Sequence, residues 1–297
     1  MITKIILKEE LNTEELRKLE ILFRETPRDI LDDFLILTDS PELARICRRF
    51  HMAVAAVLSG GRRNAAAGDA DPCGARDFSG LSDPCSARDF SGLSDSCSAR
   101  DFSGIPYAVT DIDDLDERYL ERVWQRYRRL PWIICETERC LVRETVPEDV
   151  DSFYRIYRDK SITAYMEDLF EDKEKEKQYI RDYIEKVYGF YGFGMWTVCL
   201  KETGEVIGRA GLSMREGFEE PELGYVIGKK WQRQGIAEEV CREILAYGRD
   251  ELGFERVRAL MHPGNTASKR LCCKLGFWYE EEITLDKIVY NLYYIGL

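Results

Sequence analysis

The chain has 297 residues, of which 44% are apolar and 33% charged, the balance of a globular protein long enough for two domains. Its 55 acidic and 43 basic side chains give a formal net charge of −12. That acidity argues against nucleic acid and against an anionic membrane surface as partners, because both are bound through clustered lysines and arginines.

The sequence carries no pattern typical of a signal peptide or a membrane span. The stretch from Met1 to Lys8 lacks a signal-peptide layout, and no apolar run approaches the roughly 18 residues of a span. Ten cysteines are present, but no two have CxxC spacing, so neither a zinc site nor a redox motif is supported. We therefore expect a cytoplasmic protein with reduced thiols and no bound metal.

The beginning of the chain has the pattern of a parallel α/β layer. A helix is predicted over 14–24, where leucines recur at helical spacing. Strands over 33–38 and 51–58 flank a second helix, which begins after Asp39 or Ser40. Strand, helix and strand form a βαβ unit, so we expect the two strands to be parallel.

A tandem repeat interrupts this layer. A unit of 12 residues that starts at Cys73 recurs almost unchanged from Cys85 and again from Cys97. Known repeat architectures need about 20 residues or more for each unit to bury a face. The unit is rich in Gly, Ser and Asp, so we expect a disordered insertion at about 59–104.

After the repeat the α/β pattern resumes. A short strand is predicted over 107–110, a helix over 116–129 and another strand over 131–135. Residues 1–136 are therefore predicted to form a small Rossmann-like α/β domain that carries the repeat as an insertion.

The acidic segment after the 107–110 strand offers one chemical interpretation of this domain. Asp111 and Asp113 have Asp-x-Asp spacing, which resembles haloacid-dehalogenase-like phosphatases, where such a pair supplies a nucleophile and an acid beside Mg²⁺. Asp114 and Leu115 stand where that family has Gly-Thr or Gly-Val, and no clear catalytic lysine follows. The alternative is that both carboxylates only favour the N-terminus of the next helix electrostatically.

From Thr137 onward the pattern changes to mixed α and β. A strand over 140–145 leads to a capping box at Thr145 and Glu148, which opens a helix. A second helix follows over 173–188. Three further strands are joined by short turns and read as an antiparallel meander: 195–201, 206–212 and 222–227.

The most informative segment is Gln232-Arg233-Gln234-Gly235-Ile236-Ala237, which follows a strand and opens a helix. A helix N-terminus has unpaired N–H groups and a partial positive charge, so it binds phosphates. Gly235 permits a close backbone approach, and Ala237 is too small to block it. A strand over 256–261 comes next, then Asn265-x-x-Ser268 and a helix that ends in Lys274-Leu275-Gly276-Phe277.

These motifs, in this order over 137–297, resemble the GNAT superfamily of N-acetyltransferases. The opening segment 137–144 resembles the RimJ/RimL-like branch, which acetylates N-terminal amines of ribosomal proteins. The resemblance implies a mixed, mostly antiparallel sheet with helices on both faces, an α/β (α+β) fold. It also implies acetyl-CoA as the acetyl donor and direct attack by a primary amine of a protein N-terminus or a small molecule.

The resemblance also implies roles for individual residues. Val226 and Ile227 would bind the pantetheine arm through their backbones, Asn265 its thioester end, and Lys274 the nucleotide phosphates. The pyrophosphate would lie among Gln232, Arg233, Gln234, Gly235, Ile236 and Ala237. Glu222 matches the position of the base, and Ser268, in the cofactor motif, and Tyr225 are candidate donors to the leaving thiolate. Cys272 stands where many members have a tyrosine acid.

An alternative function for the domain is an acetyl-CoA sensor without turnover, because the usual tyrosine is absent. The chain is expected to be a monomer or a homodimer. Aromatic residues are expected either to line an amine pocket or to pack in the core: Tyr165, Tyr188, Phe190, Tyr191, Phe193 and Trp196, beside Met166 and Glu167.

Overall fold

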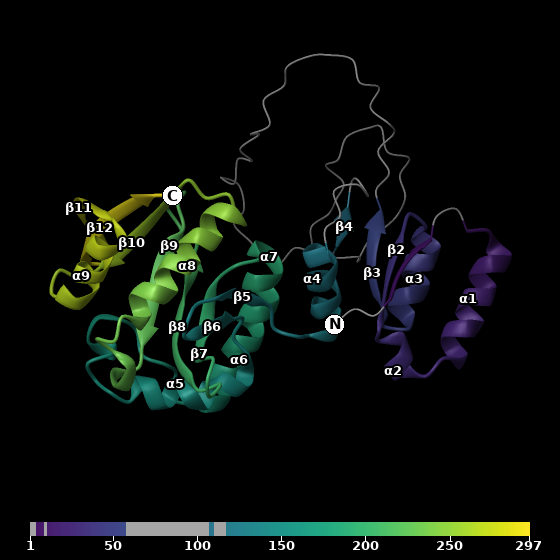
Figure 1. The fold of residues 1–297 in the computed structure, drawn as a ribbon, viewed down its shortest axis with the longest axis horizontal. Coiled ribbons are helices and arrows are strands. Elements are labelled where there is room, and N and C mark those ends of the chain that lie inside the picture. The colour runs from purple at the N-terminus through teal and green to yellow at the C-terminus, as the bar shows by residue number, and fades with distance from the viewer. Residues whose placement is uncertain (1–3, 9–10, 58–106, 110–116) are drawn as a thin grey trace, which may run out of the picture. The chain divides into compact units, whose positions relative to one another are not determined.

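The computed structural model describes residues 4–8, 11–57, 107–109 and 117–297 (Figure 1). The tandem repeat and the Asp111-x-Asp113 segment lie outside the described residues. The chain divides into two compact units, Met1–Leu130 and Pro131–Leu297. Among the described helices, none is long and apolar enough to cross a membrane.

The first unit contains a four-stranded parallel sheet in the order β1-β2-β3-β4. The predicted parallel pairing of the second and third strands is confirmed. The first strand was not predicted. The strands are β1 Lys4–Lys8, β2 Phe34–Thr38, β3 Ala53–Val57 and β4 Ala108–Val109, and the helices are α1 Thr13–Glu25, α2 Arg28–Leu31, α3 Pro41–Arg49 and α4 Glu117–Arg128.

Helices cover both faces of this sheet (Figure 1). Ile36 and Val54 pack against α1 and α3, whereas Leu35, Ala55 and Val57 pack against α4. The alternation follows from the period of two along a strand. The described strands follow one another in chain order, so their sheet lacks the reversal of strand order at which α/β proteins usually bind nucleotides.

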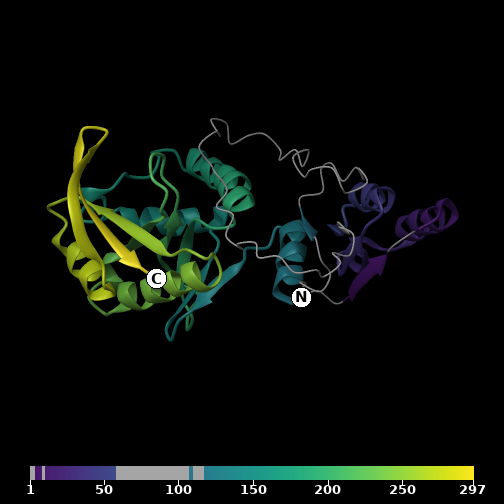
Figure 2. The ribbon, with the colours of Figure 1, turned by 90° about the horizontal axis from the view of Figure 1, so that it is seen from above.

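The second unit is built on an eight-stranded sheet in the order β11-β12-β10-β9-β8-β7-β6-β5. Every neighbouring pair is antiparallel except β9 and β10, so the predicted mixed, mostly antiparallel sheet is confirmed. Figure 2 shows the long β11–β12 hairpin in yellow at one edge. The strands are β5 Ile133–Glu136, β6 Cys140–Arg143, β7 Met195–Leu200, β8 Val206–Ser213, β9 Glu222–Ile227, β10 Arg256–Met261, β11 Trp278–Leu285 and β12 Ile288–Gly296.

The strand predicted over 131–135 belongs to this second sheet and not to the N-terminal layer. It forms β5, which pairs antiparallel with β6 across a tight turn, and Glu144 N donates to Trp132 O at 2.9 Å. The boundary between the compact units therefore falls at Leu130/Pro131 instead of 136/137. The apolar pattern of a single strand does not say which sheet it joins, which explains the difference.

Helices lie on both faces of the eight-stranded sheet. On one face, Val240 and Ile244 of α8 pack against Ile207 and Leu223. On the other, Phe153 and Tyr157 of α5 pack with Val226. The helices are α5 Val150–Tyr157, α6 Lys173–Tyr183 with a π-helical turn Ile184–Tyr188, α7 Gly189–Tyr191, α8 Ile236–Asp250 and α9 Thr266–Leu275.

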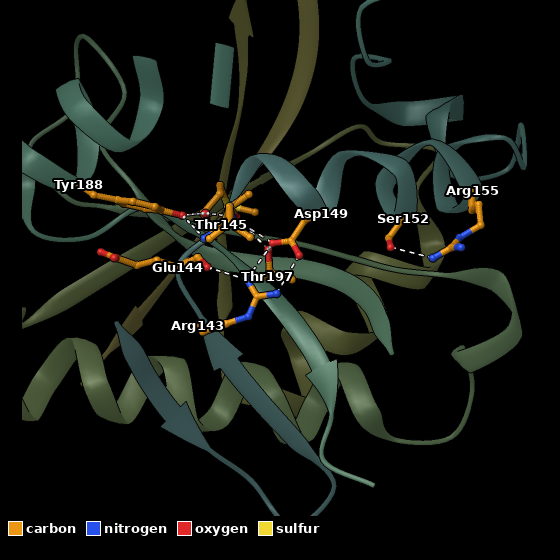
Figure 3. A network of polar contacts seen from close by, with 10 residues as sticks. Arg143, Glu144, Thr145, Asp149, Ser152, Arg155, Tyr188 and Thr197 are labelled. Atoms are coloured by element: carbon orange, nitrogen blue, oxygen red, sulfur yellow. Dashed lines mark hydrogen bonds and ion pairs between the residues drawn. The ribbon is translucent and has the colours of Figure 1, made fainter. Parts of the chain in front are cut away.

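A buried polar network fixes the start of α5 (Figure 3). Asp149, in the 3₁₀ turn Pro147–Asp149, accepts two hydrogen bonds from Arg143, at 2.7 and 2.8 Å. Its Oδ2 also accepts from the hydroxyl of Thr197 at 2.8 Å and from Val146 N at 3.0 Å. The predicted capping box of Thr145 with Glu148 is therefore replaced by this carboxylate, which reaches the first free N–H of the turn.

Candidate active site

The parallel strands β9 and β10 diverge along their length. Both strands are fully described, and they pair only where Arg258 meets Glu222, with Arg258 N donating to Pro221 O at 2.9 Å. Beyond this point β9 continues beside β8, and β10 continues beside β12. A wedge therefore opens between the two strands, closed at Glu222 and open towards their carboxyl ends.

The register of β8 and β9 decides which backbone groups of β9 face this wedge. Gly228 N donates to Ile207 O of β8 at 2.8 Å, and antiparallel pairing alternates from residue to residue. The backbone of Val226 therefore also points to β8, whereas Tyr225 and Ile227 point their backbones into the wedge. Of the two predicted backbone contacts, the register thus favours Ile227 over Val226, whose buried side chain packs against α5.

A helix N-terminus lies at the open end of the wedge. Gly235 is the N-cap of α8 and has φ 82°, a left-handed conformation that glycine adopts without strain. The first N–H groups of α8, from Ile236 and Ala237, have no partner within the helix by helix geometry. These oriented donors and the helix dipole form an anion-binding site. Arg233 is also left-handed, at φ 60°.

The two glutamines of the loop bond to the loop itself. Gln232 Nε2 donates to Ile227 O, and Gln234 Nε2 donates to Lys230 O, each at 2.9 Å. Their amide groups thus shape the turn, and the site they surround is lined by backbone N–H groups. Because Gln232 already bonds to the carbonyl oxygen of Ile227, the N–H is the backbone group of Ile227 that remains to bind a ligand in the wedge.

Salt bridges neutralise the acidic first turn of α8. Arg139 donates to Glu239 Oε2 at 2.7 Å and to Gln234 O at 2.9 Å, so it braces the loop. Lys274 lies 3.1 Å from Glu238, and its side chain is 69% exposed. Both carboxylates are therefore paired, which reduces their repulsion of a phosphate group. The role of Arg139 was not predicted, because Arg139 and Glu239 are 100 positions apart.

Glu222 lies at the closed end of the wedge with two guanidinium groups. Its Oε2 accepts from Arg215 Nε at 2.8 Å and from Arg258 Nη2 at 3.4 Å. Its Oε1 has only a 3.5 Å contact with Arg215. Arg258 is fully buried, also donates to Glu220 O at 2.6 Å, and has its pKa lowered by burial. Neither arginine was predicted as a neighbour of Glu222.

The phenol of Tyr225, one of the two candidate donors, lies beside α9 and contacts the backbone of the other, Ser268. The hydroxyl of Tyr225 donates to Ser268 O at 3.3 Å and lies 3.8 Å from Cys272 Sγ. Burial raises the pKa of Tyr225, so its phenol stays protonated. Asn265 is the N-cap of α9, and its Oδ1 accepts from Ser268 N at 3.1 Å. A phenol thus reaches the position on α9 where the GNAT resemblance leads one to expect a tyrosine.

Cys272 is not suited to a covalent acetyl-enzyme. Its thiol is fully buried, and burial raises its pKa to about 11. At pH 8 only about one thiol in a thousand would be the nucleophilic thiolate. The neighbouring Cys273 is exposed.

We expect iodoacetamide at pH 8 to alkylate Cys273 at least about tenfold faster than Cys272, because only the former is accessible. Peptide mass spectrometry over a time course measures both rates in one sample. Equal rates would mean that Cys272 is open to solvent and able to act as a nucleophile.

The predicted aromatic zone divides between core and surface. Trp196, Tyr188 and Phe193 are buried in the main core, so they cannot line an open amine pocket. Tyr165 and Tyr191 are 45% and 47% exposed. Tyr165 stacks on His262 with ring centroids 5.2 Å apart, which joins the α5–α6 segment to the end of β10.

No group of three or more potential metal ligands occurs among the described residues.

A sequence model described as "Acetyltransferase (GNAT) domain" matches residues 139–278. The uncharacterized N-acetyltransferase p20 of Bacillus licheniformis is 31% identical over 149 residues, 48% of this chain and 82% of the relative. The uncharacterized N-acetyltransferase YoaA of Bacillus subtilis is 29% identical over 161 residues, 53% of this chain and 89% of the relative.

Among solved structures, an acetyltransferase (GNAT family) from Bacillus anthracis aligns with a TM-score of 0.46 and 23% identity, over 55% of this chain and 96% of that one. The sequence matches and the arrangement of wedge, phosphate loop and α9 agree with one another. The chain therefore belongs to the GNAT acetyltransferase family, and it is an acetyl-CoA-dependent acyltransferase.

Proposed function

We propose that the enzyme transfers the acetyl group of acetyl-CoA to a primary amine by direct attack in a ternary complex. The observation that carries this proposal is the wedge between β9 and β10, with Glu222 at its closed end and the N-terminus of α8 at its open end. Phosphates at α8 would direct the pantetheine arm down the wedge, so the thioester would lie near Glu222. The buried, protonated Cys272 supports direct attack over an acetyl-enzyme.

The proposed binding roles are carried by backbone N–H groups and by three side chains of the site. Backbone N–H groups of Gly235, Ile236 and Ala237 would hold the pyrophosphate, with charge from Arg233. The backbones of Tyr225 and Ile227 would bind the pantetheine arm or the thioester oxygen. Asn265 and Lys274 would contact the arm and the nucleotide phosphates.

The proposed chemistry removes two protons from the amine nitrogen and delivers one proton to sulfur. Oε1 of Glu222, the oxygen with the weaker arginine contact, would first take one proton from the ammonium group, directly or through water. The neutral nitrogen then attacks the thioester carbonyl carbon, the carbon–sulfur bond breaks, and its electron pair stays on sulfur. The phenol of Tyr225, or alternatively the hydroxyl of Ser268, would protonate the thiolate, and the second N–H proton, lost as the amide forms, would restore that hydroxyl through water. The proton on Glu222 leaves to solvent.

The acceptor is proposed to carry an exposed primary amine, either a protein N-terminus or a small molecule. The likeness of residues 137–144 to the RimJ/RimL-like branch favours the N-terminus. Tyr165, which is half exposed and stacks on His262 just after β10, would offer its other aromatic face to an ammonium group.

Glu222→Gln is expected to lower kcat/KM about 100-fold, the range for loss of a general base. The dissociation constant of acetyl-CoA should stay within about twofold, because the amide still accepts from Arg215 and Arg258. Turnover is followed as free CoA thiol with a panel of amines, and binding by calorimetry. Tyr225→Phe should lower kcat about tenfold by the same reasoning.

The control for this series is Glu219→Gln, which removes an exposed carboxylate from the same turn. Its kinetics should match the wild type. A Glu222→Gln enzyme with unchanged kcat/KM would exclude Glu222 as the base.

A further inference from the structure

One positively charged side chain of the second unit has no role in the proposed acetyl transfer. Arg209, in the middle of β8, lies opposite Val226 of β9. Val226 packs against Phe153 of α5, and the guanidinium carbon of Arg209 lies 4.9 Å from the centroid of the same ring. Arg209 therefore points to the face of the sheet that α5 covers.

The partners of this guanidinium group are aromatic rings and a phenol. Among the described residues no carboxylate forms an ion pair with Arg209, which donates a hydrogen bond to the hydroxyl of Tyr157. Its Nε is buried and has no acceptor in the described part of the chain. Glu176, a buried carboxylate of α6, accepts instead from Phe170 N at 3.1 Å. A cation in such surroundings is costly unless a bound anion completes its hydrogen bonds.

Aromatic rings connect this charge to the surface. Tyr179 and Tyr183 lie near the guanidinium, with their ring centroids 6.0 Å apart. Tyr179 also contacts Phe170 at 6.0 Å, and these two side chains are 45% and 50% exposed. Arg209 is itself partly exposed. A small ligand can therefore reach the guanidinium from solvent along an aromatic surface.

Glu222, the proposed base, lies on the same face of the sheet as Arg209. Side chains alternate along a strand, so positions 222, 224 and 226 of β9 share one face. Arg209 pairs with Val226, which lies four residues from Glu222, about 13 Å along the strand. Both side chains are long and shorten this gap. An acceptor with its amine at Glu222 can thus place a second group, several bonds away, at Arg209.

We propose that Arg209 selects acceptors in which a carboxylate stands several bonds from the primary amine. The inference rests on the proposed acetyl transfer and names the class of amine. The carboxylate would complete the hydrogen bonds of the guanidinium, which is suited to this anion by charge and by its paired donors. Small ω-amino carboxylates share this chemistry with peptides that carry an acidic residue after their N-terminus.

The test compares two pairs of acceptors that differ by one carboxylate. ε-Aminocaproate is paired with hexylamine, and the peptide Ala-Glu-Ala-amide with Ala-Gln-Ala-amide. For the wild type, kcat/KM should be at least about tenfold higher for the carboxylate of one pair, and that pair identifies a small molecule or a peptide as the acceptor.

Arg209→Met should remove this preference by raising KM for the carboxylate at least about tenfold. We expect kcat to stay within about twofold, because the contact is equal in the ground state and the transition state. Arg209→Lys should retain part of the preference, since it keeps the charge but not the paired donors. Arg181→Ala is the matched control: this exposed arginine of α6 contacts Gln178, and its loss should leave the preference unchanged.

Equal kcat/KM within both pairs, or a preference that survives Arg209→Met, would overturn the inference and leave the acetyl transfer intact. Calorimetric titration of ε-aminocaproate and hexylamine into the CoA-bound protein measures the same preference without turnover. Binding of the carboxylate that depends on Arg209, with no acetylation of any amine, would refute the proposed reaction alone. The wild-type comparison needs no variant, so it decides the inference even if Arg209→Met folds poorly.

Discussion

Replacing Gly235 by glutamate is expected to weaken acetyl-CoA binding at least about 100-fold. The residue has φ 82°, so any side chain there costs about 1 kcal/mol in strain or shifts the loop. The new carboxylate would also stand where the phosphates approach, which we estimate at about 2 kcal/mol of repulsion and lost N–H donation. Together these are about 3 kcal/mol, or a factor of about 100 in affinity.

The fold itself should tolerate this change. A Cβ on Gly235 would meet its nearest neighbour, Arg139 Nη2, at 3.5 Å, an ordinary contact. Gly253→Glu is the matched control, because Gly253 is also left-handed, at φ 68°, with open space around it. It follows α8, a helix of 15 residues and about 22 Å in length, so it lies far from the loop. Calorimetry should show normal binding for the control, and comparable affinities for the two variants would contradict the phosphate site.

Asp149→Ala is expected to destabilise the second unit by about 3 kcal/mol or more, a shift in Tm of about 10 °C. The carboxylate is 5% exposed and accepts hydrogen bonds from Arg143, Thr197 and Val146 (Figure 3). Its removal leaves a guanidinium that is only 20% exposed without its partner. That loss of a buried partner is the reason for the large effect.

Asp151→Ala is the control for this prediction, because Asp151 lies two residues further on, in α5, and forms an exposed ion pair with Lys173 at 2.6 Å. Exposed pairs contribute little, so its Tm should equal that of the wild type. Thermal unfolding is recorded with and without acetyl-CoA, and the transition that the ligand raises belongs to the second unit. Equal Tm shifts for the two variants would mean that the network is not a stabilising contact.

The local features of the acetyltransferase unit were predictable from the sequence. The strands over 222–227 and 256–261 agree with β9 and β10 because their apolar patterns and flanking turns are short-range signals. Gly235 at the N-terminus of α8 follows from a motif of six adjacent residues. The fold class, which the structure confirms, was predictable from the same short-range signals. The chemical roles of Glu222, Tyr225 and Ser268 stay predictions.

Features that depend on tertiary contacts were not predictable. The brace from Arg139 to Glu239 joins two segments 100 residues apart, with no local signal. The arginines around Glu222 come from a turn and from a neighbouring strand. Strand register decides whether the backbone groups of Val226 face β8 or the wedge, and a shift of one residue would reverse their direction. The sequence alone does not distinguish an aromatic residue that lines a pocket from one that packs in a core, and Trp196 is buried in the core.

The most direct test is a crystal structure of the protein with acetyl-CoA. We predict the pyrophosphate at the N–H groups of Gly235, Ile236 and Ala237, and the pantetheine arm between β9 and β10. We also predict hydrogen bonds of that arm to the backbones of Tyr225 and Ile227 and none to the backbone of Val226, with the thioester beside Glu222. Acetyl-CoA bound away from the wedge, or with its phosphates away from α8, would exclude the proposed cofactor site.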